Sequence, residues 1–302
     1  MATETGWLEA DSSRLGERVK NVGFRYLLLA AALLGVVSLL ILLVYVTLDA
    51  LALLKPTDAW LDLGLLTGTY ATTPEDAGIY PQIVGSLFIM LVMVLGVFPI
   101  GVGAAVYLEE FAPDNRWTRL VQINIGNLAG VPSVVYGILG LAVFINAMGF
   151  GRGVVLVAAF TLGLLVLPIV IVSSQEALRS VPDSRRQASY GMGASRCQTV
   201  RHVVLPEAMP GILTGTILAL SRAIGETAPL LVVGLATTVF SVPTGLLDKA
   251  AALPLQIYAW VSFPQPEFRY GVVAASVVVL LVMMLSLNAA AILIRNTYQR
   301  RN

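Results

Sequence analysis

The sequence predicts an all-α membrane protein with six transmembrane helices, and three observations support this prediction. First, 57% of the 302 residues are hydrophobic and only 12% are charged, whereas a soluble domain carries about 25% charged residues. Second, the mean hydropathy is +0.82. Third, six stretches have the roughly 20 mostly apolar residues that a helix needs to cross a bilayer. These stretches are residues 26–46, 83–107, 121–148, 154–173, 212–240 and 272–294.

The positions of Lys and Arg predict how the six helices are oriented. Fourteen of the 19 basic residues lie in the N-terminal tail, in the loops after the second and fourth stretches, and in the C-terminal tail. Four lie in the alternate loops, and Arg222 lies inside the fifth stretch. Because cytoplasmic loops carry an excess of Lys and Arg, we expect both termini to be cytoplasmic.

This topology divides the chain into five parts. We expect a cytoplasmic tail, a first transmembrane helix, an extracytoplasmic loop, a transmembrane core with one long cytoplasmic loop, and a second cytoplasmic tail. In the same order, their bounds are 1–25, 26–46, 47–82, 83–294 with the cytoplasmic loop at about 174–211, and 295–302.

A second outer loop, at residues 241–270, is rich in proline and aromatic residues. Proline interrupts regular structure there. Tyr258, Trp260 and Phe263 suit the membrane–water interface, where aromatic side chains form belts. A docking surface for a partner protein is an equally good interpretation of the same residues.

Residue counts exclude several classes of chemistry. The single cysteine, Cys197, excludes an intrachain disulfide, and together with the single histidine, His202, it leaves too few ligands for most His/Cys metal or catalytic sites. None of the three lysines stands in the G-x-x-x-x-G-K-[ST] pattern of a phosphate-binding loop. We therefore expect this chain to have no catalytic residues, no metal, no cofactor, no ATPase site of its own and no nucleic-acid partner.

The long cytoplasmic loop carries a spaced pattern of small residues, glycine and proline. Gln187-Ala188-Ser189 is followed after three residues by Gly193, and after nine more by Val203-Val204-Leu205-Pro206. These intervals resemble those of the EAA loop of ABC importer permeases, which reads E-A-A, three residues, G, nine residues and I-x-L-P. In this chain Gln, Ser and Val replace the first Glu, the last Ala and the Ile.

The resemblance implies a coupling helix that docks in a groove of a cytoplasmic ATPase subunit. A short rigid helix can transmit rigid-body motion, and Gly193 allows a sharp turn after it. The alternative is an amphipathic helix that only lies at the membrane surface. We expect Arg185 and Arg186 to contact either the ATPase or lipid headgroups, and Pro206 and Pro210 to break the segment before it enters the bilayer.

Five further motifs stand in the remaining part of the chain. They are GIYPQIVGSL (78–87), GAAVYLEEFAP (103–113), GVPSVVYGILG (130–140), SRAIGETAPLL (221–231) and LPLQIYAW (253–260). Together they closely resemble the phosphate-specific ABC transporter permeases of the PstA type, from about residue 65 to the C-terminus.

The resemblance implies a type I ABC importer permease fold in the plasma membrane of a prokaryote. It also implies four partners: a second permease subunit of the PstC type, a cytoplasmic ATPase dimer of the PstB type, an extracytoplasmic phosphate-binding protein of the PstS type, and phosphate itself. The chain would then form half of a gated path in the lipid bilayer.

The motif at 221–231 places two opposite charges inside the fifth stretch. Ionisable residues at bilayer depth usually face a bundle interior or a water-filled path. Counted from residue 212 at 1.5 Å per residue, Arg222 lies roughly 15 Å along this helix, near the middle of a core about 30 Å thick. Glu226 follows four residues later, so the two side chains are expected to share one helix face.

Two interpretations of this pair remain open. It can be an internal ion pair that holds the fifth helix to its neighbours, or Arg222 can bind the transported anion through its planar fork of donors. In the second case, Glu226 can accept the P–OH hydrogen of a protonated phosphate and exclude sulfate, which has no such proton at neutral pH. Ser221, Asn127 and Ser133 are the other candidates for the anion path, although such residues often only join helices by hydrogen bonds.

Four glycines in the transmembrane stretches are expected to let helices approach closely. They are Gly101, Gly103, Gly211 and Gly215.

Three other functions compete with phosphate import. An importer of sulfate, molybdate or another oxyanion is the nearest. A self-contained secondary anion carrier would need a coupling-ion site and usually shows internal repeats; neither is visible, and such a carrier would leave the EAA pattern without a role. A membrane sensor that reports phosphate status is compatible with transport.

Overall fold

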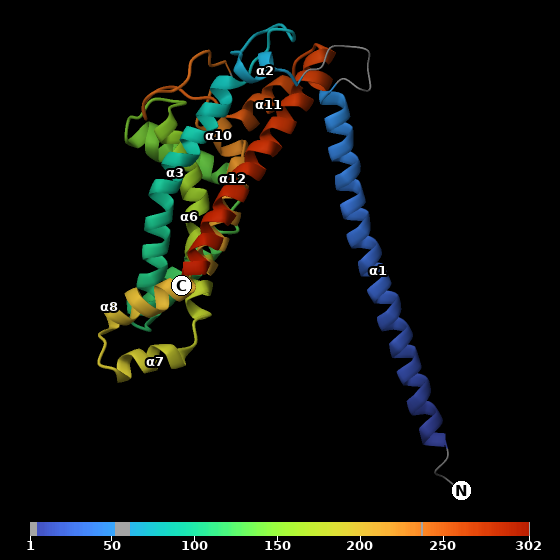
Figure 1. Ribbon diagram of the computed structural model, residues 1–302, viewed down its shortest axis with the longest axis vertical. Helices are drawn as coiled ribbons and strands as arrows, with labels where there is room; N and C mark the ends of the chain where they lie inside the picture. The colour runs from blue at the N-terminus through green and yellow to red at the C-terminus, as the bar shows by residue number, and fades with distance from the viewer. Residues whose placement is uncertain (1–4, 52–60, 237, 302) are drawn as a thin grey trace.

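The computed structural model describes residues 5–51, 61–236 and 238–301. Figure 1 shows a bundle of helices with one long helix standing beside it. In chain order, the α-helices and the π-helical turns (η) are α1 (Thr5–Ala50), α2 (Leu63–Thr67), α3 (Tyr80–Val106), η1 (Tyr107–Phe111), α4 (Arg116–Leu128), α5 (Ser133–Gly140), η2 (Leu141–Ala147), α6 (Val155–Arg179), α7 (Asp183–Gly191), α8 (Arg196–Thr199), η3 (Val200–Val204), α9 (Leu205–Ile224), α10 (Ala228–Val232), α11 (Leu253–Val261), η4 (Phe268–Val272) and α12 (Val273–Arg301).

Within these described ranges, five helices are long and apolar enough to cross a membrane. They are Lys20–Ala50, Tyr80–Phe111, Val155–Arg179, Arg196–Ile224 and Phe268–Thr297. A sixth span exists only if α4 and the following helix, formed by α5 and η2, are counted as one. These two helices, Arg116–Leu128 and Ser133–Ala147, are bent by 107° relative to each other. The prediction of one continuous helix at 121–148 is therefore wrong. Pro132 precedes α5 in an extended conformation and has no N–H with which to continue α4.

The predicted bounds of the fifth helix are also wrong. One helical axis runs from Arg196 to Ile224, in place of 212–240. Pro206 and Pro210 do not break it. The wider π-helical turn η3 comes directly before α9, so Pro206 falls in the first turn of α9, where a missing N–H is tolerated.

The helix α1 stands apart from the bundle (Figure 1). It contacts α12 and η4, and the side chains of residues 20–42 are exposed. The helix is longer than the predicted span at 26–46, because its helical conformation continues on both sides of the apolar stretch. An apolar surface of this extent is unstable in water, so lipid or another chain has to cover α1.

The helix α6 is the centre of the bundle, where it packs against α3 and α9 and buries most of its side chains. A Cβ atom added at Gly101, Gly211 or Gly215 would come within 2.8 Å of a side chain on α6. The predicted close packing is thus confirmed for these three glycines. It is wrong for Gly103, whose added Cβ would meet nothing within 4 Å.

The aromatic residues of the second outer loop form a buried cluster. Trp260 and Phe268 are fully buried, and their ring centroids lie 5.6 Å apart. The ring of Tyr70 stacks on Trp260 at 6.4 Å, and Phe263 lies 5.0 Å from Phe268. Both predictions for Trp260, a membrane belt or a docking surface, are therefore wrong, since it forms the core of a small cap. Tyr258 is 56% exposed.

The turn before α11 closes the N-terminal end of α6. The N–H of Val155 donates to the carbonyl oxygen of Asp248 at 3.1 Å. Hydrogen bonds from the Thr244 hydroxyl and from the N–H groups of Thr244 and Gly245 lower the pKa of the Asp248 carboxyl. Because this pKa is depressed in the folded state, the stabilisation by the turn is present at neutral pH and is lost as the pH falls through the folded value.

Figure 1 places the start of α1 and the end of α12 toward the end of the molecule that carries α7 and α8. Both termini thus point toward the long loop, as the distribution of basic residues predicts. That this end is cytoplasmic stays a prediction.

Candidate functional site

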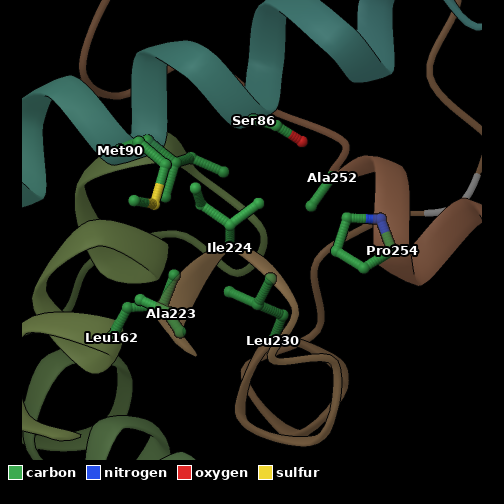
Figure 2. Close-up of a pocket in the computed structure, with 9 residues that line it drawn as sticks. Ser86, Met90, Leu162, Ala223, Ile224, Leu230, Ala252 and Pro254 are labelled. Carbon is green, nitrogen blue, oxygen red and sulfur yellow. The ribbon is translucent and has the colours of Figure 1, made fainter. Parts of the chain in front are cut away.

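The two charged residues of the fifth helix lie at a break in the bundle. The helix α9 ends at Ile224, and the N–H of Gly225 donates to the carbonyl oxygen of Arg222 at 3.2 Å. Figure 2 shows Ile224 pointing toward Met90 of α3 across a small cavity that both residues line. At 1.5 Å per residue, Met90 lies about 15 Å along α3 from its first residue. The break is therefore near the middle of a hydrocarbon core about 30 Å thick.

Arg222 lies in the last turn of α9, where a positive charge is favoured by the helix dipole. Glu226 lies just beyond the end of the helix. The expectation that both residues share a face of one continuous helix is wrong, because the helix ends between them. They still meet, since Nε of Arg222 lies 3.3 Å from Oε1 of Glu226. The Arg222 side chain is 53% exposed and the Glu226 side chain 16%.

An anion can reach Arg222 from the outer surface of the bundle, and not through the cavity behind it. That cavity measures about 10 Å³ and is lined mainly by apolar side chains of α3, α6, α9 and α10 (Figure 2). Such a volume holds about one water molecule. Arg222 does not line it. The guanidinium of Arg222 is thus accessible from the exposed face of α9.

The side chains of the other predicted path residues make their polar contacts elsewhere or none that joins them to this pair. The Oγ atom of Ser221 lies 2.5 Å from Oδ1 of Asn288, so Ser221 joins α9 to α12. Asn127 is exposed near the end of α4, and Ser133 is half-buried at the start of α5. Among the residues that the structure describes, no hydrogen bond or ion pair joins these three predicted residues to Arg222.

The residues of the predicted coupling loop lie on a short separate helix. Figure 1 shows α7 beyond the end of the bundle. Gln187 and Ala188 are exposed on it, whereas Ser189 is buried. The Ser189 hydroxyl lies 2.9 Å from the Thr199 hydroxyl of α8. This hydrogen bond gives a physical reason for a serine at the last position of the pattern, because it holds α7 against α8.

The remaining residues of the pattern connect α7 to the bundle. Gly193 has a φ of +86°, a left-handed conformation that costs other residues about 1–2 kcal/mol. Leu205 and Pro206 begin α9, which continues α8 and η3 along one axis. The turn at Gly193 thus joins α7 directly to the helix that carries Arg222.

We expect Gly193→Ala to weaken the attachment of the coupling loop, because Ala has to adopt the left-handed conformation. The destabilisation is about 1 kcal/mol, and it lowers the amount of ATPase subunit that copurifies with the chain. Gly191→Ala is the matched control, since an added Cβ there meets nothing within 4 Å and its φ is not left-handed. Equal copurification of ATPase with both variants would contradict the proposed role of the turn.

Two apolar side chains at the end of α7 are prominent and were not predicted. Met192 is 84% exposed and Tyr190 is 42% exposed. Both lie beside Gln187 and Ala188 in the sequence of the loop. The available signal was the presence of two large apolar residues in a stretch, residues 183–199, that is otherwise polar or made of small residues. Exposed apolar residues on such a tip favour a contact with another protein.

The arginines of α7 are engaged within the chain. Arg186 is 15% exposed, and its Nη2 atom donates to Oε1 of Glu110 and to the carbonyl oxygen of Leu178, each at 2.9 Å. Arg185 lies 3.3 Å from Glu207. The expectation of contact with the ATPase or with headgroups is therefore wrong for Arg186. The acidic partner was missed, although two adjacent carboxylates at the end of an apolar helix are an unusual signal.

The family model of the "Binding-protein-dependent transport system inner membrane component" matches residues 97–301. The chain is 36% identical over 226 residues to "Phosphate transport system permease protein PstA 1" of Mycobacterium tuberculosis (strain CDC 1551 / Oshkosh), a match that covers 74% of this chain and 72% of that protein. It is 37% identical over 171 residues to "Probable ABC transporter permease protein YqgI" of Bacillus subtilis (strain 168), covering 55% of this chain and 58% of that protein.

Solved structures of similar fold are also ABC transporters. A bacterial transporter involved in the import of the acidic polysaccharide alginate matches with a TM-score of 0.60 and 17% identity, over 92% of this chain and 98% of that one. The MetNI methionine ABC transporter in an inward-facing conformation matches with a TM-score of 0.59 and 21% identity, over 72% and 94%. These likenesses confirm the predicted type I importer permease fold in a multi-pass membrane protein. With the family match over residues 97–301, they show that the chain belongs to the inner membrane components of binding-protein-dependent transport systems.

Proposed function

We propose that this chain is one of two permease subunits of an ATP-driven importer that carries inorganic phosphate into the cytoplasm. Its similarity over 226 residues to a phosphate transport permease supports this substrate. The single structural observation that carries the proposal is the exposed guanidinium of Arg222 near mid-membrane depth. It lies on the helical axis that begins at the coupling loop.

The partners follow from this assignment. A second permease subunit of the PstC type faces the exposed side of α9 and completes the path. A cytoplasmic ATPase dimer of the PstB type binds α7 at Gln187 and Ala188, and supplies the ATP hydrolysis. An extracytoplasmic phosphate-binding protein of the PstS type docks at the other end. This places α7 and both termini in the cytoplasm, with residues 83–294 as the transmembrane core.

The chemistry of the site suits a partly protonated oxyanion. Arg222 presents a planar fork of donors that matches tetrahedral oxyanions. Glu226 holds this guanidinium when the path is empty, at 3.3 Å. When phosphate enters, the guanidinium binds its oxygens and the carboxylate accepts the P–OH hydrogen. Asn127, Ser133 and Ser221 are proposed to line the same path.

The complete complex in proteoliposomes tests this function. Labelled phosphate uptake is measured with and without ATP, and in the presence of sulfate or molybdate as competitors. We expect uptake that requires ATP and both partner subunits and that excess sulfate does not inhibit. Uptake without an ATPase subunit would identify a secondary carrier, and equal competition by sulfate would identify a general oxyanion importer.

We expect Glu226→Gln to weaken the exclusion of sulfate. The variant removes the negative charge that repels a fully ionised anion. If this repulsion weakens sulfate binding by about 1.4 kcal/mol, its removal raises the affinity for sulfate by about tenfold. The inhibition constant of sulfate for phosphate uptake therefore falls by about tenfold. Glu75→Gln, in an exposed outer loop, is the control. If sulfate remains excluded, Glu226 only restrains Arg222.

A further inference from the structure

Three arginines converge on one π-helical turn at the end of α3. The turn η1 (Tyr107–Phe111) continues α3, and π-helical turns frequently occur at functional sites. The last three side chains of this turn each contact an arginine from a different element. Glu109 accepts a hydrogen bond from Arg179 of α6 at 2.8 Å, Glu110 accepts one from Arg186 of α7 at 2.9 Å, and the Phe111 ring centroid lies 5.5 Å from the guanidinium carbon of Arg196 of α8.

The middle contact is the most buried of the three. The side chains of Arg186 and Glu110 are 15% and 7% exposed. Arg186 also donates to the carbonyl oxygens of Leu178 and Val181 and to Oδ1 of Asp183. One guanidinium thus holds α7, the end of α6 and the end of α3 together. A buried pair of this kind demands exact geometry, because either charge left alone is strongly unfavourable.

These contacts matter because α3 is not directly connected in the chain to the predicted coupling loop, since α4, α5, η2 and α6 lie between them. The chain joins α7 to α6 on one side and to α8 on the other. The contact of α3 with α6 is largely apolar along the bundle, and packed helices can slide by small amounts. An ion pair between fixed partners resists such sliding, since it tolerates only a narrow range of geometry.

We propose that η1 passes the movement of α7 to α3, and that Glu110 and Arg186 are the positioning residues for this step. The inference rests on the proposed function, in which an ATPase moves α7. It adds a third helix to the two that the chain connectivity already links to the coupling loop. The movement then reaches α6, α9 and α3 together, so the wall of the path opens as one body.

The experiment uses the complete complex in proteoliposomes and measures phosphate transported per ATP hydrolysed. Glu110→Gln keeps an oxygen that can accept the hydrogen bond but removes the opposite charge. We expect the ratio, measured on the assembled complex, to fall by about tenfold, the size of an ordinary coupling energy between two sites. The yield of complex also falls, because Arg186 loses its buried partner. Arg186→Lys keeps the charge but loses the planar fork, and it lowers the ratio in the same way.

Asp183→Asn is the matched control. Asp183 carries the other carboxylate that contacts Arg186. The Asp183 side chain is 85% exposed, and it lies on α7 itself. We expect Asp183→Asn to transport as much phosphate per ATP as the wild type. Glu110→Asp keeps the negative charge, so we expect its ratio to lie between those of Glu110→Gln and the wild type.

Three results would overturn the inference. The first is an unchanged ratio in both Glu110→Gln and Arg186→Lys. The second is an equal fall in Asp183→Asn. The third is a lower yield of complex with an unchanged ratio in the assembled fraction, because the ion pair would then only stabilise the fold. If the wild-type complex transports another anion, the proposed substrate is wrong, and the same ratio is measured with that anion.

Discussion

Arg222→Gln is expected to lower phosphate uptake by about 10- to 100-fold, since a hydrogen bond to a charged group contributes about 1.5–3 kcal/mol and each 1.4 kcal/mol is a factor of about ten. The guanidinium is the basic group at mid-membrane depth on the exposed face of α9. Without it, the anion meets Glu226 and no compensating charge. Uptake of labelled phosphate by the reconstituted complex measures the effect, with ATPase copurification as the check on assembly.

A double variant separates the two interpretations of the pair. If Arg222 binds the anion, Arg222→Gln/Glu226→Gln transports as poorly as Arg222→Gln alone. If Arg222 only neutralises Glu226, the double variant regains uptake, because no unpaired carboxylate remains. Arg119→Gln is the control for the loss of an arginine, since this side chain is 73% exposed on α4. Normal uptake by Arg222→Gln in an assembled complex would exclude Arg222 from the anion path.

Gly85→Ala is expected to destabilise the whole outer cap. An added Cβ atom would lie 2.2 Å from the carbonyl oxygen of Ala251, and a backbone atom cannot move aside as a flexible side chain can. The same region holds α11 on α3, because the N–H of Leu253 donates to Oγ of Ser86 at 2.9 Å. Overpacking of this kind costs about 1–3 kcal/mol. The midpoint of thermal unfolding of the purified chain in detergent measures it.

Gly103→Ala on the same helix is the matched control for this prediction. An added Cβ there meets nothing within 4 Å. Replacing a helical glycine by alanine then stabilises the helix by about 0.5–1 kcal/mol. The two substitutions should therefore shift the unfolding midpoint in opposite directions. A Gly85→Ala variant as stable as the wild type would mean that α11 does not rest on α3 as described.

The spanning helices and the helix and turn of the predicted coupling loop were predictable because both depend on local signals. Apolar length identified the five spanning helices, although it could not show the bend of 107° between α4 and α5. The spacing of Gln187 from Gly193 placed a helix and a turn correctly, since a left-handed turn needs glycine wherever it occurs. The contact between Arg222 and Glu226 was also predicted, although for a helix that ends between them.

What escaped prediction either was masked locally or depends on contacts between distant parts of the chain. The end of α9 at Gly225 does have local signals, a glycine at the helix end and Pro229 in the first turn of α10, but the apolar run up to residue 240 masked them. The packing of Trp260 against Tyr70 in the outer cap is of the second kind.

The sequence by itself determined the class of protein, five spanning helices, the short helix and turn that carry the spaced pattern, and the residues of the charged pair. Apolar length and residue spacing are properties of continuous stretches of chain. The tertiary structure alone decided that Arg222 stands on an exposed face beside a helix end, and that Arg186 belongs to Glu110. The latter two residues are 76 positions apart. Such a pairing follows from the packing of α3 against α6, which brings their ends together, and no local pattern encodes that distance.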